Sequence, residues 1–263
     1  YEDADRRFIN TQAVIGEGTG RRCEGVQACA SRREPVLTSE EIEQALQSCT
    51  LSACQEAKAL LARLTDEAAA VEYKTVANEL GPVIDEMRQG DMARDPLIAV
   101  HALCNQMRAR TEDRIRLAEA VTEEDEAALE TLYRSQVWDD LSFSLAAFPY
   151  WRAWIDLEIA RLNPDRQELT RDLLPARKGF RAASMQLFRP GLVFGGWLGL
   201  GYVEMQQGRQ QVALAIFENL NQALAQEPDH PVRKAVQLEL RLLEAHQGKV
   251  KTMRKGRVID DTE

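Results

Sequence analysis

Apolar residues recur every three or four positions along most of the chain, which is the pattern of helices that bury one face. The first two such segments lie near residues 39–48 and 53–64. Thr38 is followed three residues later by Glu41, the pattern of a capping box, in which each side chain accepts a hydrogen bond from the other residue's backbone N–H. A third segment begins near residue 65. The chain from residue 38 onward is therefore predicted to be a series of helices.

Glycine, proline and threonine mark the expected ends of these helices. The third segment reaches Gly81-Pro82, where glycine can adopt a left-handed conformation and proline cannot continue the helix. Two later segments open at Thr111 and Thr122, each followed by acidic residues that suit a helix N-terminus. Farther on, a helix is expected to restart at Pro149.

The fold class follows from the absence of strand patterns. No alternating run rich in Val, Ile and Thr is bounded by turn residues, and Ala, Leu, Glu, Gln and Arg are abundant. We predict an all-α protein, with about two thirds or more of its residues helical. The expected organisation is an irregular arm (1–36), an N-terminal helical region (37–139), a helical-repeat region (140–250) and a tail (251–263).

One stretch of the repeat region, residues 195–228, has a distinctive spacing. Glycine 208 is preceded by apolar and small residues and followed by a small and an aromatic residue at fixed intervals; the residues are Trp197, Leu200, Gly201, Gly208, Ala213 and Phe217. This spacing resembles the tetratricopeptide repeat (TPR), a helical hairpin in which small residues let two helices approach closely.

The resemblance implies antiparallel helical hairpins stacked into a right-handed α-solenoid, with Gly201 and Ala213 facing each other across a close helix contact. Solenoids of this kind bind proteins or peptides along a concave face. The chain departs from the family pattern at Glu204, where an aromatic is usual, and at Pro228, which comes about three residues late. The second copy is weak and keeps only its leucines and Gly248.

The net charge of −9 disfavours nucleic acid and anionic lipid as partners, because both are polyanions. The longest apolar run is shorter than the roughly 20 residues of a transmembrane helix, so no transmembrane segment is expected. We therefore expect the partner to be a protein or peptide. The oligomeric state stays open.

Four cysteines lie close together in sequence: Cys23, Cys29, Cys49 and Cys54. If the protein is exported, we expect them to form two disulfides, with three possible connectivities, that fasten the arm to the first helices while Cys104 stays reduced. The alternative is that all are buried thiols of a cytoplasmic protein. Both locations stay open.

Catalytic, cofactor-binding and metal-binding residues are not indicated. The three histidines are far apart, and the cysteine pairs lack the short spacing of zinc ligands. The segment Gly16–Gly20 has no Lys-Ser/Thr after it and is not a phosphate-binding loop. We assign no catalytic residue, no metal site and no cofactor.

Candidate partner-binding residues are the aromatic pair Trp151 and Trp154 and the basic residues Arg177, Lys178 and Arg181. Tryptophan and arginine are enriched at binding hot spots, although aromatic clusters also form cores and basic residues also line solvated helix faces.

The sequence thus predicts a non-enzymatic helical-repeat scaffold, bacterial in composition, that mediates protein–protein interaction in envelope assembly or secretion. The alternative is an all-α enzyme or helical regulatory domain acting on cell-wall glycan or a lipid intermediate. A deep pocket lined by converging carboxylates would favour that alternative.

Overall fold

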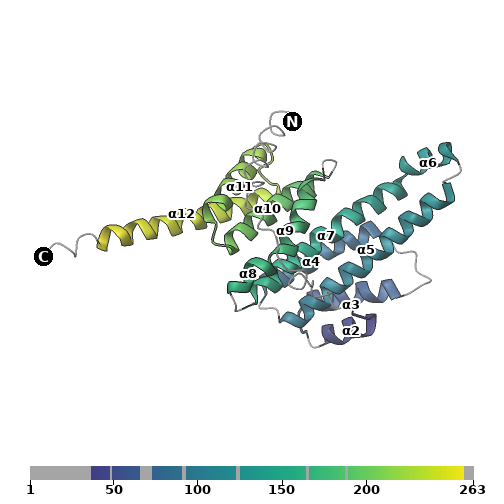
Figure 1. Ribbon diagram of the computed structural model, residues 1–263, viewed down its shortest axis with the longest axis horizontal. Coiled ribbons are helices and arrows are strands. Elements are labelled where there is room, and N and C mark those ends of the chain that lie inside the picture. Colours follow the sequence, from purple (N-terminus) through teal and green to yellow (C-terminus); the bar gives the residue numbers. More distant parts are fainter. Residues whose placement is uncertain are drawn as a thin grey trace, which may run out of the picture. The chain divides into compact units, whose positions relative to one another are not determined.

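The computed structural model describes residues 37–47, 49–65, 73–90, 93–122, 125–163, 166–186 and 189–257. Within these ranges the chain is helical and contains no strand, which confirms the predicted all-α class. The helices, labelled in Figure 1, are α2 (Ser39–Gln47), α3 (Ser52–Thr65), α4 (Tyr73–Gln89), α5 (Arg94–Thr122), α6 (Glu126–Tyr133), α7 (Gln136–Arg161), α8 (Arg166–Asp172), α9 (Leu174–Ser184), α10 (Pro190–Gln206), α11 (Gln210–Ala223) and α12 (Pro231–Arg257). The chain divides into a unit of residues 37–216 and a unit that continues from residue 217.

The start of α2 confirms the predicted capping box. The Thr38 hydroxyl accepts from the Glu41 N–H at 3.2 Å, and the Glu41 carboxylate accepts from the Thr38 N–H at 2.7 Å. Ile42 and Leu46 are buried, and α2 packs on α3 and α5. The bounds of α2 and α3 agree with the sequence prediction to within one residue.

α4 continues through Gly81-Pro82, so the predicted helix end there is wrong. Proline at position 82 lacks the N–H that would bond to the carbonyl four residues earlier. α7 packs against this part of α4, and the Trp151 indole N–H donates to the Ala77 carbonyl at 2.8 Å. The Trp151 ring would lie 3.0 Å from a Cβ at position 81. Gly81 is therefore explained by the close approach of a tryptophan, not by a helix end.

α5 is also longer than predicted, because the segment expected to open at Thr111 is continuous with the segment before it. The Thr111 side chain is buried, and its hydroxyl donates to the Met107 carbonyl one turn back at 2.9 Å. It therefore satisfies its hydroxyl within the helix and does not cap a new one.

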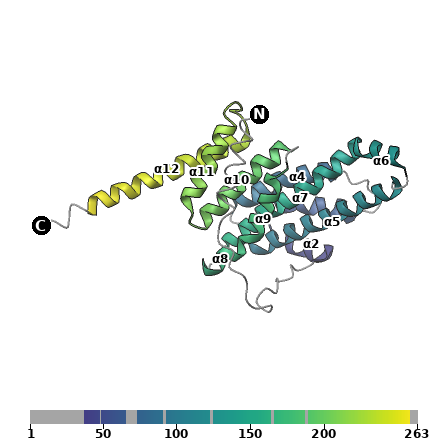
Figure 2. The ribbon, with the colours of Figure 1, turned by 45° about the horizontal axis from the view of Figure 1, so that its top comes forward.

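α6 begins at a different cap from the one predicted, and α7 has no break at Pro149. α6 is capped by Asp125, which accepts from two backbone N–H groups, and not by Thr122. Ser135 caps α7, which then runs without a break through Pro149. α7 packs beside α5 and also contacts α4, α9 and α10, so it is the central helix of residues 37–216 (Figures 1 and 2).

Glycines let α10 approach α9 and α7 closely. A Cβ at Gly196 would lie 2.6 Å from the backbone nitrogen of Ser184, and one at Gly199 would overlap the Phe180 ring. A Cβ at Gly195 would likewise overlap the Tyr150 hydroxyl. Close contacts with α7 and α9 thus account for Gly195, Gly196 and Gly199.

The predicted turn at Gly208 is confirmed, since this residue has φ +75° and follows α10 directly. Gly248, the glycine kept by the weak second copy, lies within α12, which continues to Arg257, so it does not form a turn between helices. In the unit from residue 217 onward, the Gln237 side chain donates to that of Asn221 at 3.4 Å, and Phe217, Leu220 and Val236 are fully buried.

One disulfide joins Cys49 and Cys54, with an S–S distance of 1.99 Å. It links the connection between α2 and α3 to the first turn of α3, so it does not fasten the arm to these helices as predicted. Cys23 and Cys29 lie outside the described residues. Cys104 is a free, buried thiol, as predicted.

No helix within the described ranges combines the length and the apolarity that crossing a bilayer requires.

Candidate binding site

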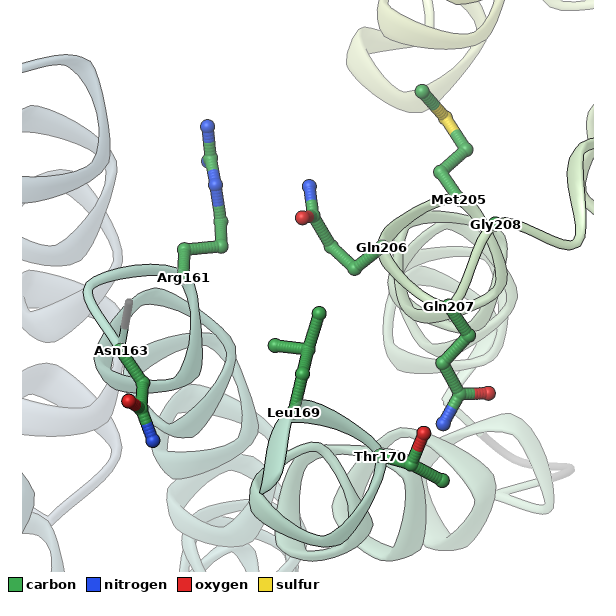
Figure 3. Close-up of a pocket in the computed structure, with 8 residues that line it drawn as sticks. All are labelled: Arg161, Asn163, Leu169, Thr170, Met205, Gln206, Gln207 and Gly208. Atoms are coloured by element: carbon green, nitrogen blue, oxygen red, sulfur yellow. The ribbon is translucent and has the colours of Figure 1, made fainter. Parts of the chain in front are cut away.

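A pocket of about 590 Å³ lies where α8 meets the C-terminal ends of α7 and α10 (Figure 3). Its walls hold three carboxamides, one hydroxyl, one guanidinium and two apolar side chains; the lining residues are Arg161, Asn163, Leu169, Thr170, Met205, Gln206, Gln207 and Gly208. In Figure 3, Arg161 and Gln206 extend from opposite walls with Leu169 below them, and Gln207 points toward Thr170. Among the lining residues that the structure describes, none carries a carboxylate, thiol or imidazole.

Two helix ends shape the pocket. α7 ends at Arg161, and the N–H of Leu162 bonds to the Glu158 carbonyl at 3.1 Å. α10 ends at Gln206, and the left-handed Gly208 lets the following residue return its N–H to the Glu204 carbonyl at 2.9 Å. Because the last turn of a helix is an electronegative end, both ends favour hydrogen-bond donors of a ligand.

A buried glutamate fixes the α10 end of the pocket. Glu204 is only 2% exposed and accepts from Arg177 of α9 at 2.8 Å and from Arg209, just past the turn. A buried carboxylate is tolerated when it is paired in this way.

A second glutamate fixes the α7 end. Glu158 lies 3.0 Å from Arg161 and 3.4 Å from Arg88 of α4. The Arg88 guanidinium in turn stacks on Trp154 at 3.6 Å from the ring centroid. Arg161 is therefore held by a network that reaches into the core, while about half of its side chain stays exposed at the pocket rim.

The structure places the five predicted partner-binding residues outside this pocket. Trp154 is 2% exposed and packs on Phe180 in the core, and Trp151 is half-buried with its N–H bonded to α4. Arg177 pairs with Glu204, whereas Lys178 and Arg181 lie exposed on α9.

Sequence reasoning did not identify Arg161, Gln206 or Gln207 as site residues. The available signals were the helix stop after Arg161 and the paired glutamines before the turn glycine, but neither signal shows that the two helix ends meet.

A second polar cluster lies buried between α5 and α7. His101 contacts Asp156 at 3.1 Å, and Arg152 donates to Asn105 at 3.1 Å. Burial raises the pKa of the nearby Cys104 thiol to about 12. A buried, protonated thiol is a poor nucleophile, so we interpret the cluster as structural.

No group of three or more His, Cys, Asp or Glu within the described part of the chain could hold a metal ion. No protein-family model, curated protein or solved structure matches this chain.

Proposed function

We propose that this protein is a non-enzymatic helical scaffold that binds a peptide segment of a protein partner in the pocket between α7, α8 and α10. The observation that carries the proposal is the chemistry of the lining, in which three of the eight described residues carry neutral carboxamides. A carboxamide both donates and accepts hydrogen bonds, as a peptide main chain does, so the two are complementary. Leu169 and Met205 supply apolar contact beside the polar groups.

The size of the pocket supports the same proposal. A cavity of about 590 Å³ falls within the usual range of ligand pockets, and its opening between helix ends would admit part of a chain. Gln206 is half-buried and Thr170 is exposed, and within the described residues neither side chain makes a hydrogen bond or ion pair. Both groups are therefore available to a ligand.

The alternative, an all-α enzyme acting on glycan or lipid, gains no support at this pocket. Glycoside hydrolysis needs two carboxyl groups facing the substrate, and none is found among the described residues that line the cavity. The two nearest glutamates described above, Glu158 and Glu204, are each bound by two arginines. This arrangement suits anchoring better than proton transfer.

The proposal retains the TPR-like hairpin of residues 195–228 and a right-handed solenoid as expectations, with bacterial envelope assembly or secretion as the expected setting. If this expectation holds, the pocket lies beside Gly208, at the turn between the two helices of the hairpin.

A peptide display library tests the proposal. Peptides enriched on the wild-type protein should bind the double variant Gln206→Ala/Gln207→Ala at least about tenfold more weakly, a loss of about 1.4 kcal/mol. The matched control is Gln210→Ala/Gln211→Ala, because these glutamines are exposed on α11 and do not line the pocket. Equal binding by the pocket variant, or hydrolysis of cell-wall fragments by the wild-type protein, would contradict the proposal.

A further inference from the structure

α9 buries one face. Ala176, Phe180, Ala183 and Ser184 are buried, and α9 packs on α7 and α10. Their spacing of four, three and one residues places them on a single side of the helix.

The opposite face of α9 is exposed and combines apolar with basic side chains. Leu174, Lys178, Arg181 and Met185 follow one another at intervals of four, three and four residues, so they form a stripe on the side away from Phe180. We call this stripe the outer face of α9. Leu174 and Met185 are each 48% exposed, so their apolar side chains are accessible to a partner. The two cations lie between them.

The outer face is a local positive region in an acidic chain. α9 contains three cations and no acid, although the whole chain has a net charge of −9. Glu204 pairs with Arg177, which lies beside the stripe. Within the described residues, Lys178 and Arg181 have no acidic group within ion-pair distance. Their charge is therefore available to an anionic partner.

We propose that the outer face of α9 docks an acidic amphipathic helix of a partner protein. Leu174 and Met185 lie eleven residues apart, about 16 Å along a helix axis, which matches three turns of a partner helix. Apolar side chains of the partner would cover these two ends, and its carboxylates would pair with the two cations between them. This surface is separate from the pocket, and the proposal does not rest on pocket function.

Charge and apolarity together select this partner over other anions. Nucleic acids and anionic membranes are bound through many cations, whereas this stripe offers two and the chain as a whole repels polyanions. Leu174 and Met185 strengthen binding only when the partner also carries apolar groups that cover them.

The test measures fluorescence anisotropy with a labelled synthetic helix of about 18 residues that has leucines along one side and glutamates beside them. Two comparison peptides are used: a scrambled one of identical composition, and one with lysine in place of glutamate. We expect the designed peptide to bind at least about tenfold more tightly than either. Lys178→Glu/Arg181→Glu and Leu174→Ser/Met185→Ser should each weaken its binding by at least about tenfold.

The matched control is Arg114→Glu/Leu117→Ser, which makes the same kinds of change on an exposed part of α5 and should change binding by less than about twofold. Circular dichroism establishes that every variant is folded. If the designed and scrambled peptides bound with equal affinity, binding would depend on charge alone, and the proposal would be overturned. Tighter binding to single-stranded RNA or to phosphatidylserine vesicles would overturn it too, as would loss of peptide binding only in the Gln206→Ala/Gln207→Ala variant.

Discussion

At the residue scale, burial and ion pairing determine which side chains contribute most to the stability of the fold. Glu204 accepts from two arginines, and its neighbours in α10 leave it 2% exposed. Cys104 and Tyr150 are buried titratable groups whose neutral forms suit their surroundings. The free energy of unfolding should depend on each of these residues in a way that can be measured.

Glu204→Gln should lower the free energy of unfolding by about 1–3 kcal/mol, because the amide leaves Arg177 and Arg209 without a counter-charge. The two guanidinium groups are 32% and 41% exposed, so water will compensate part of the loss. Urea unfolding followed by circular dichroism measures the difference. Glu43→Gln is the control, since this exposed residue should change stability by less than about 0.5 kcal/mol. Equal stability of Glu204→Gln and wild type would rule out the pairing.

Alkaline pH should destabilise the fold through Cys104 and Tyr150. Burial raises the pKa of each to about 12, from ordinary values of 9.0 and 10.0. The folded protein therefore keeps protons that the unfolded chain loses, so the contributed stability is complete below pH 9 and falls as the pH rises toward 12. Each group lowers the free energy of unfolding by about 1.4 kcal/mol per pH unit within its range.

The measurement is a series of urea unfolding curves between about pH 8 and about pH 11. Cys104→Ala and Tyr150→Phe should each show a smaller fall than wild type, by roughly 1–3 kcal/mol over this range. Comparing slopes removes the constant cost of the cavity that each variant leaves. Parallel slopes for wild type and variants would show that these groups do not keep their protons in the fold.

At the scale of the helix, packing between elements decides what a glycine or proline does. In α10, Gly196 meets the backbone of α9, which cannot rotate away as a side chain can. In α4, Trp151 of α7 packs on Gly81, the residue before Pro82, and donates to the Ala77 carbonyl.

Gly196→Ala should destabilise the protein by about 1–3 kcal/mol, because the new Cβ would lie 2.6 Å from the Ser184 nitrogen and 2.7 Å from the Phe180 carbonyl oxygen. Gly191→Ala is the matched control on the same helix, since nothing lies within 4 Å of its Cβ position. Alanine favours the helix, so this control should be neutral or slightly stabilising. Thermal unfolding of the two variants compares them, and similar melting temperatures would argue against close α9–α10 packing.

These contacts show how far sequence reasoning extends for this chain. The all-α class and the capping box at Thr38 were predictable because both depend on residues close in sequence. The continuity of α4 through Pro82 and of α7 through Pro149 was not predictable, because proline ordinarily breaks a helix and the local sequence does not show that these helices continue. The pocket was missed for the same reason: Arg161 and Gln206 are brought together only by packing.

At the scale of the whole molecule, one covalent link adds to this packing. The disulfide between Cys49 and Cys54 closes a short loop at the junction of α2 and α3. Closing so short a loop restricts the unfolded chain only slightly, so the chain-entropy estimate is about 2 kcal/mol.

Cys49→Ala/Cys54→Ala should therefore lower the free energy of unfolding by about 2 kcal/mol without changing the helical content. Peptide mapping of the unreduced protein should recover residues 49 and 54 in one linked fragment, and Cys104 should react with a thiol reagent only after unfolding. Recovery of Cys49 or Cys54 linked to a different cysteine would contradict the described bond.

The central position of α7 has a consequence for synthesis of the chain on the ribosome. α4 and α5 are made before α7 and pack against it, and α9 and α10 follow it and pack against it as well. A nascent chain that has not yet released α7 would expose the apolar faces of α4 and α5, where chaperones bind and aggregation begins. Residues 37–216 should gain lasting protection from amide hydrogen exchange only late in translation, once α7 and its later partners have emerged from the exit tunnel.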